Sequence, residues 1–231
     1  MSMMSRPEWK QLVKRGDLLK FLESQIPGFG IRRKQNSFFM KALSLILFFN
    51  KRFMDSYVTT VYPRIYVPSW WGKSKHRWRA EMEILAHEYV HLRDRKKLGW
   101  AFNLLYLSPQ IFSLLAIGAV WNLWFLLALV FLLPWPSPGR AWLEFRGYRM
   151  SLAIKYWTLV ERKVNEEKLY TFVEKYDITW VVDQFTKSSY YFMFPFKKFL
   201  NRKFRESLRE IAKDNLSDEL REIKEVFLRK K

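Results

Sequence analysis

The sequence of 231 residues contains no cysteine and only three histidines. Without thiols the chain can form no disulfide bond, no thiolate–zinc site and no cysteine nucleophile. Any transition-metal site must therefore be built from histidine, aspartate and glutamate side chains. Hydrophobic residues are abundant, at 49% of the chain, which excludes a polar disordered protein and supplies a substantial core.

Acidic residues are also scarce, because 22 Asp and Glu face 41 Lys and Arg and leave a formal net charge of +19. Such a surplus favours anionic partners, either lipid headgroups or nucleic acid. The basic residues are spread along the chain, without a zinc finger, a helix-turn-helix or an aromatic RNA-binding motif, so nucleic-acid binding is the less favoured alternative. The first twenty residues lack the apolar core of a signal peptide, and export by that route is not expected.

The pattern of apolar residues predicts several elements. We expect an amphipathic helix over 6–26, a buried strand over 44–50 and β-structure over 57–68 with a turn or edge position at Pro63. Residues 77–98 have a helical composition, and Gly99 is a typical C-terminal stop. Further helices are expected from 139 or 140 to about 164, over 165–176, and as one helix or a helix pair from 198 onward.

The segment "HEYVH" places His87 and His91 four residues apart on the predicted helix. Residues i and i+4 project from nearly the same face, so both imidazoles can bind one metal ion. Glu88 is rotated by roughly 100° from His87, which suits it to reach a metal-bound water rather than the metal. This H-E-x-x-H pattern predicts a zinc site with a glutamate general base. The alternative is a helix that carries two structural or surface histidines.

A third ligand must come from elsewhere. Asp94 and Lys97 stand where a metzincin would have glycine and histidine, which excludes that class, and His76 lies in a basic, solvent-like run. Glu144 is the best candidate, because it follows a proline-rich turn in a helical sequence, and Gly147 leaves space for another helix to approach. More charged surroundings disfavour four other downstream glutamates: Glu161, Glu166, Glu167 and Glu174.

On these residues the chain resembles the gluzincins, zinc metallopeptidases with HExxH on one helix and a zinc-binding glutamate on a later one. The matching residues are His87, Glu88 and His91, with Glu144 in "LEFRGY", and the likeness covers roughly residues 44–150. The resemblance implies hydrolysis of peptide or protein substrates with zinc as the cofactor. The strand-rich segment before the motif also looks like the edge strand that lines the substrate cleft in such enzymes.

One position departs from the family pattern, in which an aspartate often follows the ligand glutamate by four residues. Tyr148 stands there in this chain. The carboxylate that orients a ligating histidine would then be Asp94 or Asp183, or its place is taken by a backbone carbonyl. Tyr148 or Arg146 could bind the oxyanion of the tetrahedral intermediate. The alternative for both is ordinary packing or surface charge.

No charged residue occurs in the 34 residues from Trp100 to Leu133. If the three predicted ligands share one ion, both ends of this segment must lie on one side of a bilayer, because a single crossing would separate them by about 30 Å. Two full crossings need roughly 40 apolar residues. We therefore expect a tight or shallow helical hairpin, or a segment buried against protein. Some gluzincins of the prenyl-protein protease type insert membrane helices at this place.

Tryptophans and flanking basic residues around this segment suit a membrane interface with anionic headgroups. We expect membrane contact through 100–133, with the active site on the cytoplasmic side. A soluble cytoplasmic protein, in which the hairpin completes the core, is the alternative. The tryptophans concerned are Trp100, Trp121, Trp124, Trp135 and Trp142.

Together these patterns predict an α+β, mostly helical fold. A small sheet is expected beside the HExxH helix, with a second helix carrying the third ligand and the apolar hairpin between the two helices. The predicted boundaries give an N-terminal helix and basic loop at 1–43, a metallopeptidase domain at 44–176 and an aromatic segment with a charged C-terminal helix at 177–231. The alternative function is a non-catalytic basic protein that binds membrane or nucleic acid.

Overall fold

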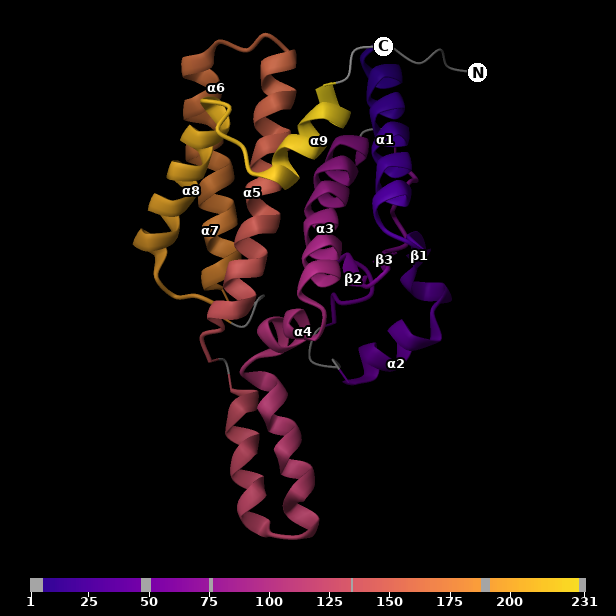
Figure 1. Cartoon of the computed structure of the whole chain (residues 1–231), viewed down its shortest axis with the longest axis vertical. Coiled ribbons are helices and arrows are strands. Elements are labelled where there is room, and N and C mark those ends of the chain that lie inside the picture. The colour runs from indigo at the N-terminus through magenta and orange to yellow at the C-terminus, as the bar shows by residue number, and fades with distance from the viewer. Residues whose placement is uncertain (1–5, 47–50, 75–76, 134, 188–191, 229–231) are drawn as a thin grey trace. The chain divides into compact units, whose positions relative to one another are not determined.

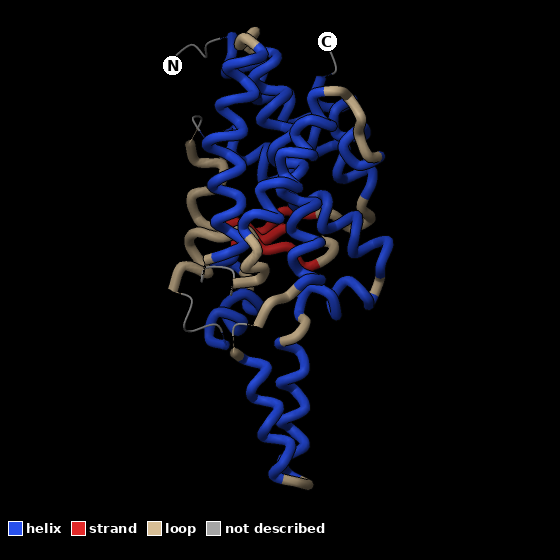
Figure 2. Tube along the Cα trace, turned by 90° about the vertical axis from the view of Figure 1, so that its left-hand side faces the viewer, coloured by secondary structure: helices blue, strands red, loops and turns tan. Residues whose placement is uncertain are grey.

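The computed structural model is mostly helical, with one small mixed β-sheet, and it confirms the predicted α+β class (Figures 1 and 2). It describes residues 6–46, 51–74, 77–133, 135–187 and 192–228.

The chain divides into two compact units. The first consists of Met1–Arg93 together with Ser217–Lys231, and the second of Asp94–Leu216. The division therefore falls inside the predicted 44–176 domain and differs from the predicted boundaries. The end of the chain belongs to the first unit because Arg93 forms ion pairs with Glu219 and Glu222, both at 2.9 Å.

In its described part, the first unit contains four α-helices, the short 3-10 helix η1 (Lys34–Asn36) and the sheet. The side chains that fill its core come from all four α-helices and from the central strand, and include Leu22, Met40, Ile65, Leu85 and Ile223. The helices are α1 (Arg6–Gln25), α2 (Phe38–Ile46), the part of α3 (Trp78–Leu98) up to Arg93, and α9 (Asp218–Leu228).

The sheet has the strand order β1-β3-β2, with β1 (Gly30–Arg33) parallel to β3 (Arg64–Val67) and β2 (Thr59–Val61) antiparallel to it. The strands are the red segments in Figure 2. Pro63 lies in the turn between β2 and β3, as predicted. Strand β1 was not expected, since the sequence predicts a basic loop there.

The strand predicted at 44–50 is wrong for residues 44–46, which end α2; residues 47–50 lie outside the described part of the chain. A short apolar run does not distinguish a buried strand from a buried helix. The helix start carries a signal that favours α-structure, because the hydroxyl of Ser37 accepts a hydrogen bond from the backbone N–H of Met40 at 3.3 Å. Met40 then packs in a small cluster with Phe53 and Tyr66.

The second unit is entirely helical in its described part. Its core lies between the long helix α5 and the helices that follow it, where Leu152, Phe185 and Phe204 are buried together. The helices expected after residue 139 and from 198 onward are present. The elements are α4 (Trp100–Leu107), η3 (Gln110–Val120), η4 (Leu123–Leu132), α5 (Pro138–Glu161), α6 (Glu166–Phe172), the π-helix η5 (Val173–Ile178), α7 (Thr179–Thr186) and α8 (Lys197–Ala212).

The 3-10 helices η3 and η4 lie side by side in both views (Figures 1 and 2). Gly118 lets them approach, because a Cβ there would meet the ring of Phe125 at 2.8 Å. Ala128 is the only buried residue of the two helices, all of whose residues are described. Within the described residues, no single helix is both long and apolar enough to cross a bilayer. Only α4 and η3 taken together reach that length and composition, and they are bent by 91°.

Candidate metal centre

The two histidines of the HExxH motif lie one turn apart on α3. Their Nε2 atoms are 3.1 Å from each other. Both residues are buried, with exposed fractions of 9% for His87 and 5% for His91. Two nitrogens bound to one zinc at about 2.05 Å, with a tetrahedral angle between them, would be roughly 3.3 Å apart. The imidazole pair therefore fits two positions of one zinc ion.

Helix α3 is held firmly on the side of α9. The phenol of Tyr89 donates a hydrogen bond to Glu222 at 2.7 Å, and Arg93 binds the same carboxylate. Burial, together with the hydrogen bond to Glu222, raises the pKa of Tyr89 well above its usual range. Because Leu85 and Val90 are fully buried, rotation of the helix would expose apolar surface, and the orientation of the histidines is fixed.

The half-buried Glu88 lies toward the sheet. Its Oε2 accepts a hydrogen bond of 2.6 Å from the hydroxyl of Thr60, which belongs to the edge strand β2. A carboxylate held by one oxygen keeps its other oxygen available to a water molecule. The contact therefore fixes Glu88 without occupying all of its hydrogen-bonding capacity.

A fully buried lysine lies in electrostatic reach of Glu88. The Nζ of Lys34 donates to the backbone oxygen of Phe53 at 2.7 Å and lies 3.8 Å from the centroid of that ring. Burial lowers the pKa of Lys34 to about 8, while the carboxylates of Glu88 and Asp55 act in the opposite direction. At neutral pH the site of Glu88 therefore contains a buried positive charge.

Lys34→Met is expected to change how stability depends on pH. In the wild type the pKa rises from about 8 in the folded state to 10.5 on unfolding, so the unfolded state binds more protons between these pH values. The unfolding free energy should thus increase from pH 8 to pH 10.5 by up to roughly 3 kcal/mol relative to the variant. Urea unfolding across this range measures the difference. If the unfolding free energies of wild type and variant depended on pH in the same way, the buried charge would be contradicted. Lys41→Met, which makes the same change at an exposed position, is the control.

Glu144 lies on α5 in the second unit, whereas His87, Glu88 and His91 belong to the first. It is a buried carboxylate with 3% exposure. Its Oε1 accepts a hydrogen bond of 2.7 Å from the phenol of Tyr106, on α4 of the same unit. A buried carboxylate is costly unless charges or hydrogen bonds compensate it, so Glu144 has the character expected of a ligand rather than of a surface residue.

Tyr148, the residue considered for the oxyanion, is part of the core of the second unit. Its ring packs against Trp180 and Phe185, with centroid distances of 6.0 and 5.7 Å. This environment agrees with the packing alternative that the sequence left open.

The other charged candidates bind each other or nearby lysines. Arg146 donates to both carboxylate oxygens of Asp94, at 2.9 and 3.0 Å. Asp183 is bound by Lys187 and Lys197, and the hydrogen bond from Lys187 is the main reason that its pKa is lowered. Since Asp94 is paired with an arginine and Asp183 with lysines, their described contacts do not include a histidine. His76 lies outside the described residues.

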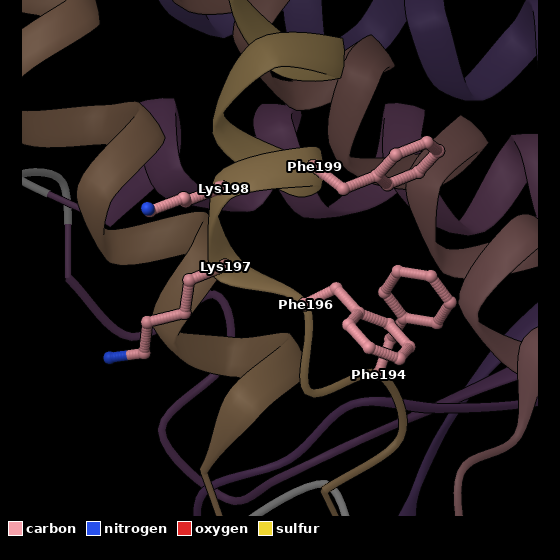
Figure 3. A pocket seen from close by; sticks show the side chains of 5 residues that line it. All are labelled: Phe194, Phe196, Lys197, Lys198 and Phe199. Atoms are coloured by element: carbon pink, nitrogen blue, oxygen red, sulfur yellow. The ribbon is translucent and has the colours of Figure 1, made fainter.

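A shallow pocket of about 500 Å³ opens in the second unit near the start of α8 (Figure 3). Its rings face away from the two ammonium groups, and its lining contains no imidazole or carboxylate, so it lacks the ligands of a zinc site. The lining residues are Phe194, Phe196, Lys197, Lys198 and Phe199.

Comparison with known proteins adds no relative. No protein-family model matches the chain, and neither the curated proteins nor the solved structures contain a match. The resemblance to gluzincins therefore rests on His87, Glu88, His91 and Glu144 and on their surroundings.

Proposed function

We propose that the chain is a zinc-dependent peptidase that hydrolyses peptide bonds in peptide or protein substrates. The observation that carries the proposal is the buried pair of His87 and His91, whose Nε2 atoms are 3.1 Å apart, with Glu88 on the same helix. Bound zinc would lower the pKa of a coordinated water and polarise the substrate carbonyl.

Glu88 has the role of general base in this proposal. Its carboxylate is ordered by Thr60 and keeps an oxygen free to accept a proton from the attacking water. Because Thr60 belongs to edge strand β2, the same hydrogen bond couples the base to the strand along which we propose that substrate binds.

We propose Glu144 as the third ligand. Helix α3 continues without a break through Asp94, three residues after His91, and Arg146 lies two residues after Glu144 on α5. Asp94 and Arg146, which form paired hydrogen bonds within the second unit, are thus each near a predicted ligand in the sequence. The proposed arrangement has the small sheet beside α3, the third ligand on α5, and the apolar helical pair inserted between these helices in the sequence.

Zinc analysis of the purified chain, combined with an assay of hydrolysis on an unfolded protein substrate, tests this function. A chain that holds no stoichiometric zinc and hydrolyses nothing would refute it. The competing function, a basic protein that binds membranes or nucleic acid without catalysis, predicts binding that weakens steeply with salt and needs no metal.

We further propose that η3 and η4 contact a lipid bilayer, with the metal centre on the cytoplasmic side. The apolar side chains of these helices and of the turn between them are largely exposed, including Trp124 on η4 at 75% and Trp121 in the turn at 82%. Exposed apolar surfaces of this extent are typical of membrane or protein contacts. A soluble protein that buries this pair in its core, the alternative, would cover those side chains.

The double variant Trp121→Ser/Trp124→Ser changes two exposed tryptophans at and next to the turn between η3 and η4. It is expected to bind lipid vesicles about tenfold or more weakly, because two large apolar side chains no longer enter the bilayer. Sedimentation with vesicles of phosphatidylcholine and phosphatidylserine measures the binding. Trp180→Ser removes an exposed tryptophan from α7 and is the matched control. If the double variant bound as tightly as this control, the membrane contact would have to be placed elsewhere.

A further inference from the structure

The phenol of Tyr106 is directly hydrogen-bonded to Glu144. Its oxygen lies 2.7 Å from Oε1 of the carboxylate, and both residues belong to the second unit. In the sequence, Tyr106 lies within the long uncharged segment, whose apolar composition gives no indication of a role in a metal site. In the structure it brings a polar group to a buried carboxylate.

Three contacts fix the Tyr106 residue itself. The Nε of Arg140 donates to the backbone oxygen of Tyr106 at 2.7 Å, and the guanidinium carbon lies 5.3 Å from the centroid of its ring. Phe102 stacks on the ring at a centroid distance of 5.8 Å and an interplanar angle of 12°. The phenol is therefore held in place by contacts independent of its bond to Glu144.

A fixed donor on one carboxylate oxygen has a specific chemical effect. The hydrogen bond to Oε1 restricts rotation of the carboxylate and holds this group, the proposed ligand, in a defined orientation. A phenol stays neutral near pH 7 and donates its proton without adding charge.

We infer that Tyr106 is a positioning residue that orients Glu144 for a divalent metal ion. This inference rests on the proposed function, in which Glu144 is a zinc ligand. It places the orienting group on α4, and it assigns a role in the metal centre to a residue outside the HExxH motif and its glutamate.

The test is the zinc affinity of the full chain, measured by competition with a chromophoric chelator. Tyr106→Phe keeps the ring and its stacking but lacks the hydroxyl, and it should bind zinc about 10- to 100-fold more weakly. Tyr170→Phe is the matched control, because it removes a hydroxyl that accepts a hydrogen bond of 3.3 Å from Arg209 in the same unit. This control should bind zinc as the wild type does.

A double-variant comparison separates positioning from general damage to the fold. In a Glu144→Ala background, Tyr106→Phe should cause no further loss of zinc affinity, whereas a purely structural role would cause the same loss in both backgrounds. Wild-type affinity in Tyr106→Phe, or equal losses in both backgrounds, would overturn the inference and leave the proposed function intact. A wild-type chain that binds no zinc would overturn both.

Discussion

Glu88→Gln is expected to retain zinc and to lose hydrolysis by about 10²- to 10⁴-fold, the usual contribution of a general base. Glutamine has nearly the shape of glutamate, and its oxygen can still accept the hydrogen bond that Thr60 donates to Glu88 at 2.6 Å. It cannot take a proton from water at neutral pH. Zinc content by atomic absorption and kcat on a fluorogenic peptide measure the two properties separately.

The matched control is Glu83→Gln, which makes the same change elsewhere on α3. This variant should keep both zinc and hydrolysis. If Glu88→Gln retained wild-type kcat, Glu88 would not be the base, even with zinc present. If Glu88→Gln lost zinc as well, its carboxylate would have to be reconsidered as a ligand.

Glu144→Ala is expected to weaken zinc binding by more than about 100-fold, because the loss of a ligand should exceed the effect of losing an outer hydrogen-bonding partner. The same substitution leaves the hydroxyl of Tyr106 without its carboxylate acceptor. This costs about 1–3 kcal/mol of stability, so circular dichroism must show that the variant is folded. Competition with a chelator measures the affinity.

Glu161→Ala is the control for the choice of ligand. Glu161 also lies on α5, is exposed, and was among the glutamates that the sequence disfavoured. The Glu161→Ala variant should bind zinc as the wild type does. Unchanged affinity in Glu144→Ala, or a loss in Glu161→Ala instead, would show that the third ligand had been chosen wrongly.

The elements that the sequence predicted well are those with local signals. Helix α3 ends at Leu98 because Gly99 takes a positive φ of 55°, which suits glycine. The β-structure on either side of Pro63 follows from β-branched and aromatic residues next to a turn. The apolar pattern from residue 198 onward likewise predicted one helix or a helix pair, and the structure has α8 and α9 there.

Elements that depend on distant partners were not predicted. Strand β1 exists because it pairs in parallel with β3, in the register Ile31 to Ile65, and the local sequence is too basic to suggest a strand. The membership of α9 in the first unit also depends on long-range ion pairs to Arg93. Periodicity within one segment carries no information about such pairings.

In the candidate site, too, the sequence predicts what depends on local spacing and misses what depends on distant partners. The convergence of His87 and His91 follows from their spacing on one helix, and the structure contains it. Their surroundings come from remote segments, since Thr60 reaches Glu88 from a strand and Tyr106 reaches Glu144 from the apolar segment. No motif marks these partners.

X-ray absorption at the zinc edge of the zinc-loaded wild type tests the central claim most directly. The proposal predicts two imidazole nitrogens, from His87 and His91, and oxygen ligands that include one carboxylate, all at about 2.0–2.2 Å. The imidazole signal should fall in His87→Ala and in His91→Ala. A spectrum with oxygen ligands alone, or one that neither histidine variant changes, would contradict a zinc centre at this motif.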